Sequence, residues 1–534
     1  MRKEKDCMDT FSRFLLGLFL CVAGVVGLEA QESTAQPPQD VLIVGAETTG
    51  TSSLDPARAT GEGLNVILSH IYNKLVTFGL EDRSQIVPEL AESWDIEADG
   101  RTWTFHLRQD VTFHSGNPFT ADDVVFSLQR LLTLAETPAW RLSQFGITPE
   151  SIRKIDPYTV QIVLKRQYAP GYFLSCLAYP TAGSILDRAL VLEHEIDNDL
   201  GTAWLASHSA GSGAFILKQW VQGQFLLLER SENFWEDWTP HLQQIIIREM
   251  SPLQQMIMLE QAEIDLAWNL QPEQIAALRE YPEIYVYETP EFNIMYLGMN
   301  VGFAPLGSPE VRDAIRYAID YDAIVSEILQ HGAVKIQTCI PQGMFGYNPA
   351  MPYTLDRDRA RNLLRQAGYP EGFAVELLCV PTHPWSAIAV KIQSDLAQIG
   401  VEVRLKFMTG IDVYSTYRAQ EHQMVLAQWR SDYADPDDNA KTFAHSTSVE
   451  KDAKVLSLAW RNKYVNLETS KLVEQGAYEL DREKRAAVYK QVTDIILDDG
   501  PFAILCSSLR QVGTRLEEFD VPPSFFMFDA STFK

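Results

Sequence analysis

Residues 387–407 change from a helical pattern to a strand pattern at a single glycine, Gly400. The apolar positions are Ile388, Ile392, Leu396 and Ile399, followed by Val401, Val403, Leu405 and Phe407. The first four recur at helical spacing, and the last four alternate with charged or polar residues as in a half-buried strand. Glycine favours the left-handed backbone that often closes a helix. A helix joined to a strand in this way is a recurrent unit of α/β layers, so an α/β fold is predicted.

The same two periods recur elsewhere in the chain. Residues 101–108 alternate like a half-buried strand, and the Asp99-Gly100 pair before them predicts a hairpin turn. Thr120 and Asp123 have the spacing of a capping box and predict a helix over 120–132. Residues 308–329 predict another helix, with Ser308 as its N-cap. With 534 residues, the chain is predicted to form more than one domain.

The N-terminus has the pattern of an export signal. Basic residues precede the apolar run 14–28, which is too short for a typical membrane-spanning helix. Ala30 fits the last position before cleavage, and a polar, flexible lead-in follows at 31–39. Residues 1–30 are therefore predicted to be a signal peptide that directs the chain to the periplasm, with a retained membrane anchor as the alternative.

Four cysteines lie beyond the predicted signal, and the sequence does not pair them. They are interpreted as single buried thiols: Cys176, Cys339, Cys379 and Cys506. No CxxC or HxxxH spacing occurs, so no metal site and no cofactor are predicted.

Charge and motifs exclude several functions. The chain has 71 acidic against 45 basic residues and a net charge of −26, which repels nucleic acid. GxSxG, HExxH, Walker and GxGxxG motifs are absent. Ser151 and Lys154 have the SxxK spacing of serine acyl-transferring enzymes, but no SDN or KTG motif accompanies them. A non-enzymatic protein is predicted, with a periplasmic serine hydrolase at these two residues as the alternative.

Residues 427–439, AQWRSDYADPDDN, combine four aspartates with a tryptophan and a tyrosine. Aspartate and proline are common in turns, so a solvated turn is one interpretation. A cation held by a carboxylate against aromatic walls is the other. For Asp435, Asp437 and Asp438, the turn and solvent exposure are expected.

Several long segments resemble one protein family. Residues 87–131, VPELAESWDIEADGRTWTFHLRQDVTFHSGNPFTADDVVFSLQRL, are similar to the signature region of extracytoplasmic solute-binding proteins of the dipeptide/oligopeptide class, which serve ATP-binding-cassette (ABC) importers. Further similar segments follow in the family's order at 52–57, 71–76, 211–235 and 295–325. The resemblance covers residues 40–534.

This resemblance implies a two-lobed periplasmic-binding-protein fold of the large peptide-binding type (class II). Lobe I would span 40–292, with an inserted subdomain at about 82–204, and lobe II would span 293–507. Residues 508–534 would return to lobe I. Ligand would lie between lobes that close by hinge bending.

The resemblance also implies site residues. In peptide-binding relatives, the aspartate of a WxxD segment pairs with the α-ammonium of the peptide, and Trp429 and Asp432 occupy these positions here. Tyr433 would add a hydroxyl or a wall. Residues 57–65 match a ligand-lining loop, which adds Thr60, Gly61 and Glu62.

The segment that holds the ligand's carboxylate departs from the family. Dipeptide-binding relatives carry an arginine in the loop that corresponds to 377–385, where Cys379 stands here. Leu426 occupies the place of another arginine that oligopeptide-binding relatives can carry. A longer peptide could leave the cleft, His383 or a distant arginine could substitute, or the ligand could lack a carboxylate.

Together, these features predict a monomeric periplasmic receptor that delivers a peptide or an amine-bearing, peptide-like solute to a membrane permease. The alternative ligands within the same fold are an oligosaccharide, haem or a metal chelate.

Overall fold

A computed structural model describes residues 40–48, 52–59, 62–79, 82, 84–236, 242–453 and 455–517. The predicted signal peptide and lead-in, and residues 518–534 of the predicted C-terminal return, lie outside the described residues. No helix in the described part of the chain is long and apolar enough to cross a membrane.

A four-stranded antiparallel sheet forms where the sequence predicts the first hairpin. Its order is β4 (Ala91–Ile96), β5 (Thr102–Leu107), β7 (Thr159–Val163) and β6 (Ile152–Asp156). Asp99 closes the predicted turn by accepting the backbone N–H groups of Arg101 and Thr102. Trp103 and Phe105 of β5 are fully buried in one hydrophobic cluster with Val124 and Leu128 of helix α3 (Ala121–Leu134). The predicted hairpin and helix are thus confirmed.

A twelve-stranded mixed sheet contains most of the other described strands. Its main order is β16-β15-β17-β13-β18-β11-β1-β10-β9-β8, and β12 and β14 also pair with β18. The strands are β1 (Val41–Ala46), β8 (Phe215–Val221), β9 (Phe225–Arg230), β10 (Gln244–Glu249), β11 (Leu266–Ala267), β12 (Tyr285–Pro290), β13 (Asn293–Met299), β14 (Ala333–Lys335), β15 (Phe373–Cys379), β16 (Val401–Phe407), β17 (Met424–Arg430) and β18 (Phe502–Thr514). A separate short pair is β2 (Val76–Phe78) with β3 (Ile86–Pro88).

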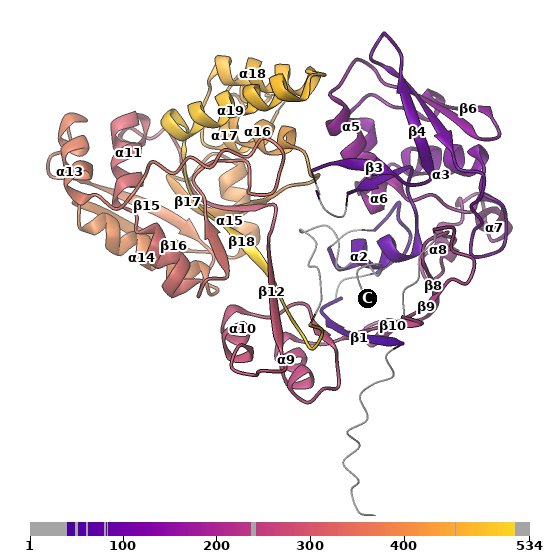
Figure 1. The fold of residues 1–534 in the computed structure, drawn as a ribbon. Helices are drawn as coiled ribbons and strands as arrows, with labels where there is room; N and C mark the ends of the chain where they lie inside the picture. Colours follow the sequence, from indigo (N-terminus) through magenta and orange to yellow (C-terminus); the bar gives the residue numbers. More distant parts are fainter. Residues whose placement is uncertain are drawn as a thin grey trace, which may run out of the picture. The chain divides into compact units, whose positions relative to one another are not determined.

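Strand β18 joins the two parts of the large sheet. Its first half pairs with β13, and residues 509–514 pair with β12 (Figure 1). Because β12 and β13 are consecutive, the chain changes strand partners near Phe292 and again near Ser508. These positions lie close to the domain limits predicted at 292 and 507, which stay predictions.

Helices α11 (Pro309–Ala318), α13 (Arg357–Gln366) and α14 (Trp385–Ala397) lie in the same part of the structure as strands β15 and β16 (Figure 1). The predicted helix–glycine–strand unit is confirmed: Gly400 has φ +87° between α14 and β16. The helix predicted over 308–329 begins at its predicted cap, where Ser308 accepts the N–H of Val311. Its predicted length is wrong, because α11 ends at Ala318 and Asp320 caps a new helix, α12 (Tyr321–Ala323), followed by a π-helical turn.

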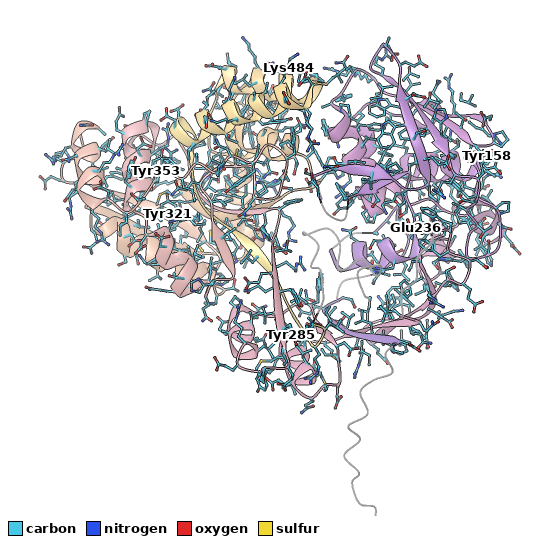
Figure 2. All side chains as sticks on the ribbon, in the orientation of Figure 1. Tyr158, Glu236, Tyr285, Tyr321, Tyr353 and Lys484 are labelled. Carbon is cyan, nitrogen blue, oxygen red and sulfur yellow. The ribbon has the colours of Figure 1, made fainter. Side chains whose placement is uncertain are left out.

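The described part of the chain contains further helices. They are α2 (Glu62–Ile71), α4 (Trp140–Ser143), α5 (Pro170–Leu177), α6 (Pro180–Gly183), α7 (Arg188–Glu193), α8 (Thr202–Leu205), α9 (Pro252–Glu260), α10 (Pro272–Leu278), α15 (Gly410–Arg418), α16 (Pro436–Ala444), α17 (Leu458–Arg461), α18 (Leu467–Tyr478) and α19 (Arg482–Asp499). Lys484 lies on the outer side of α19, and its side chain is 73% exposed (Figure 2).

The four cysteines beyond the predicted signal are buried and unpaired, as predicted. Ser151 and Lys154 have separate partners. The Ser151 hydroxyl accepts the backbone N–H of Thr148, and the Lys154 ammonium pairs with Asp122 at 2.6 Å.

Candidate functional site

Two of the predicted ligand residues follow the carboxyl ends of parallel strands. Strand β15 runs parallel to β16 and β17, and His383 and Asp432 come shortly after β15 and β17 end. In the other part of the large sheet, β1 runs parallel to β10 and β11. Ligands of open α/β sheets bind outside the carboxyl ends of their strands, so both residues lie in a favourable place for a site.

Asp432 is fixed through its main chain. Its N–H donates to the Asp438 carboxylate at 2.7 Å, and its carbonyl accepts from Nε and Nη2 of Arg141 at 3.3 and 3.2 Å. Its side chain is half-buried. Within the described residues, no hydrogen bond or ion pair engages its carboxylate. Burial raises the pKa of Asp432, and the charge of Arg141 opposes the rise. A partly desolvated carboxylate of this kind is suited to receive a cation.

Arg141 supports the candidate site residue Asp432 and was not predicted from the sequence. It lies in α4, 291 positions from Asp432, and its guanidinium stands 4.0 Å from the ring centroid of Tyr179. No motif surrounds it, because its role depends on a contact between distant segments. Its hydrogen bonds join α4 to the turn that presents the Asp432 carboxylate.

The other aspartates of the segment are buried, so their predicted exposure to solvent is wrong. Asp435 forms a two-pronged ion pair with Arg485 of α19, at 2.7 and 2.5 Å. Asp437 accepts the Tyr433 hydroxyl at 3.1 Å, and Asp438 accepts the Asp432 N–H. Burial raises the pKa of Asp437, and burial together with the charge of Asp432 raises that of Asp438. Through these contacts, the buried carboxylates stabilise the turn and the start of helix α16.

The two aromatic residues of the segment lie in different surroundings. Tyr433 is 1% exposed, and its ring stacks on Tyr172 with centroids 5.2 Å apart. Trp429, near the end of β17, is half-buried and packs against the same large hydrophobic cluster. Trp429 therefore has more surface left for a ligand than Tyr433. Their roles in ligand binding stay predictions.

The remaining predicted residues are less well defined. His383 is exposed in the loop after β15, and its Nε2 lies 3.5 Å from the Glu273 carboxylate of α10. Thr60 and Gly61 lie outside the described residues. Glu62 is the first residue of α2, and its side chain lies outside the described part. The structure thus brings Asp432 and Trp429 to one strand end and leaves the contribution of the 60–62 loop a prediction.

Comparison with known proteins gives this geometry its context. Residues 85–451 match the family model for the middle region of the bacterial extracellular solute-binding proteins, family 5. The chain belongs to this family. Family 5 is a family of extracellular solute-binding proteins, which confirms the predicted family and places the chain outside the cytoplasm.

Individual relatives match over most of their length. The probable D,D-dipeptide-binding periplasmic protein DdpA of Escherichia coli K12 is 28% identical over 488 residues, which cover 90% of this chain and 91% of that protein. Heme-binding protein A of Haemophilus influenzae is 27% identical, covering 84% of each. The solved structure of DppA from Helicobacter pylori in complex with peptide STSA has 28% identity and a TM-score of 0.71, covering 92% of this chain and 97% of that one. The predicted two-lobed α/β fold is confirmed.

Proposed function

We propose that this protein is the periplasmic receptor of an ABC importer and that it captures a short peptide or a peptide-like amine. The half-buried Asp432 carboxylate supports this proposal best, because a cation in contact with it would offset its desolvation. The names of the dipeptide-binding relative and of the peptide complex support the same ligand class. The receptor acts as a monomer, is exported by its N-terminal signal peptide, and passes its ligand unchanged to a membrane permease.

Calorimetry against a panel of dipeptides and tripeptides tests this function. Each peptide is offered with a free N-terminal amine and with that amine acetylated. Acetylation removes the positive charge, and we expect it to weaken binding by about 100-fold or more, because a buried charge pair loses its partner. Equal binding of both forms would contradict the proposal. Haem is the second candidate because of the haem-binding relative, and haemin belongs in the same titrations.

Affinity for an amine-bearing peptide is expected to fall as pH falls. The Asp432 carboxylate must be ionised to pair with an ammonium, and burial raises its pKa above the ordinary value. Binding should therefore be full above the raised pKa and decline as pH drops through it. The free α-amine of a peptide titrates near pH 8, so titrations below about pH 7 isolate the carboxylate.

Dissociation constants measured at several pH values, for the wild-type protein and for Asp432→Asn, check this expectation. The variant should show a flatter profile, because asparagine does not titrate. Profiles of the same slope would show that another group controls the pH dependence.

A further inference from the structure

Two carboxylates, those of Asp432 and Asp438, meet at the turn after β17. One oxygen of Asp438 lies 2.7 Å from the backbone nitrogen of Asp432. The residue Asp438 is 6% exposed, whereas Asp432 is half-buried. Neighbouring carboxylates disfavour the state in which both are ionised, so the two groups titrate as a pair.

Asp438 is the member of the pair for which ionisation is more costly. Within the described residues, its carboxylate accepts one hydrogen bond, from the Asp432 N–H, and forms no ion pair. A buried carboxylate without a cation tends to bind a proton instead. Burial raises the pKa of Asp438 well above its ordinary value, and the charge of Asp432 raises it further. Asp435 differs, because Arg485 donates to both of its oxygens.

Arg141 supplies positive charge on the Asp432 side of the pair. Its Nε and Nη2 donate to the main-chain carbonyl of Asp432, and the residue is 9% exposed. A buried guanidinium favours the ionised form of a nearby carboxylate, because the surrounding protein screens the attraction less than water does. Accordingly, the charge of Arg141 opposes the effect of burial on the pKa of Asp432.

The same arginine leaves the Asp432 carboxylate open. Its guanidinium lies 4.0 Å from the ring centroid of Tyr179 and 5.3 Å from that of Trp140. The Tyr179 hydroxyl accepts the side-chain amide of Asn65 on α2 at 2.9 Å. Arg141 is thus held by aromatic rings and a main-chain carbonyl, and among the described residues it forms no ion pair with Asp432. The carboxylate keeps its charge available for a ligand.

Other titratable or charged groups also face this pair. They are Cys176 of α5, Tyr179 before α6, Tyr433 of the turn, and Asp437 and Lys441 of α16. Burial raises the pKa of the thiol and of both phenol groups, so these three stay uncharged at neutral pH. Asp437 raises the pKa of Asp438 and Lys441 lowers it, and both effects are smaller than that of burial.

We propose that Asp432 and Asp438 carry a single negative charge at neutral pH, with the proton on Asp438 and the charge held on Asp432 by Arg141. The environments of the two carboxyl groups differ enough to give them different roles. Asp438 positions the turn through its hydrogen bond, and Asp432 receives the ammonium of the ligand. This inference rests on the proposed function and names the ionisation state in which the receptor binds a cation.

Asp438→Asn tests where the charge lies. Asparagine is neutral, has the shape of the protonated acid, and keeps an oxygen for the Asp432 N–H. At pH 7, we expect it to weaken binding of the best amine-bearing peptide of the panel by less than about threefold, against about 100-fold for Asp432→Asn. Calorimetry measures both. A loss for Asp438→Asn comparable to that for Asp432→Asn would overturn the assignment of the charge.

Arg141→Gln tests what holds the charge. Without the guanidinium, the pKa of Asp432 should rise further, so binding of the amine should be lost at a higher pH as pH falls. Arg141→Lys retains the charge and should stay closer to the wild-type midpoint. A merely structural role would change the affinity without moving this midpoint, and an unmoved midpoint would overturn the role of Arg141. These variants keep the inference testable if Asp438→Asn does not fold.

Infrared difference spectroscopy of the ligand-free protein separates this inference from the proposed function. At pH 7, the wild-type protein should show a protonated carboxyl group that Asp438→Asn lacks. Absence of this difference would overturn the inference, whatever the protein binds. A wild-type protein that shows the protonated group but binds no amine-bearing peptide would refute the proposed function and leave the charge assignment intact.

Discussion

Asp432→Asn is expected to lower the affinity for amine-bearing peptides by about 100-fold, equivalent to about 2.7 kcal/mol. The change removes the negative charge and keeps the size of the side chain. Losing one member of a buried, hydrogen-bonded charge pair costs about 2–5 kcal/mol, because the other charge is left desolvated. The contacts that fix residue 432 should survive, since Asp438 and Arg141 bind its main chain. Calorimetry with the best-binding peptide measures the effect.

A matched control separates this local effect from a general loss of negative charge. Asp358→Asn removes the same charge from a side chain that is 93% exposed in α13, and it should leave the affinity within about twofold. An N-acetylated peptide should bind the wild-type protein and Asp432→Asn about equally, because it has no ammonium to lose. Unchanged affinity of Asp432→Asn for the free amine would mean that the ammonium is held elsewhere.

Local signals in the sequence predicted those parts of the fold that form within a few residues. The Asp99 turn, the Ser308 cap and the Gly400 helix end each depend on neighbours at most three positions away. The α/β class followed from such units, and the family resemblance supplied the two-lobed arrangement. The sequence pattern did not predict the helix break at Ile319, because apolar residues continue at helical spacing beyond the end of α11. Asp320 nevertheless caps a new helix there.

Contacts between distant segments could not be predicted from local patterns. Composition alone suggested that residues 435–438 face solvent, since aspartate and proline are typical of exposed turns. The structure instead buries these carboxylates against Arg485 and Tyr433, and Arg141 reaches the turn from α4. A buried carboxylate needs a partner, and here the cation for Asp435 comes from fifty positions along the chain. The candidate site thus has a recognisable motif and a support that only the tertiary structure reveals.

The second large effect is expected at the buried ion pair between Asp435 and Arg485. Arg485→Met is expected to lower the free energy of unfolding by about 3–5 kcal/mol, because it leaves Asp435 buried without its cation. Both side chains are nearly inaccessible, at 5% and 4% exposed, and the pair is joined through both oxygens of the carboxylate. Arg485 also donates to the carbonyl of Gly476, so α18 and α19 lose a further contact. Urea unfolding followed by circular dichroism measures the change.

The neighbouring Lys484→Met is the control. Its ammonium lies 3.8 Å from Asp481 at the surface of the same helix, so its loss should change the free energy of unfolding by less than about 0.5 kcal/mol (Figure 2). Combining Arg485→Met with Asp435→Asn should cost less than the sum of the two single changes, because the second removes the charge that the first leaves unpaired. Strict additivity, or a loss no larger than that of Lys484→Met, would mean that the Asp435–Arg485 pair does not hold the turn. In that case Asp432 would owe its position to Arg141 and Asp438 alone.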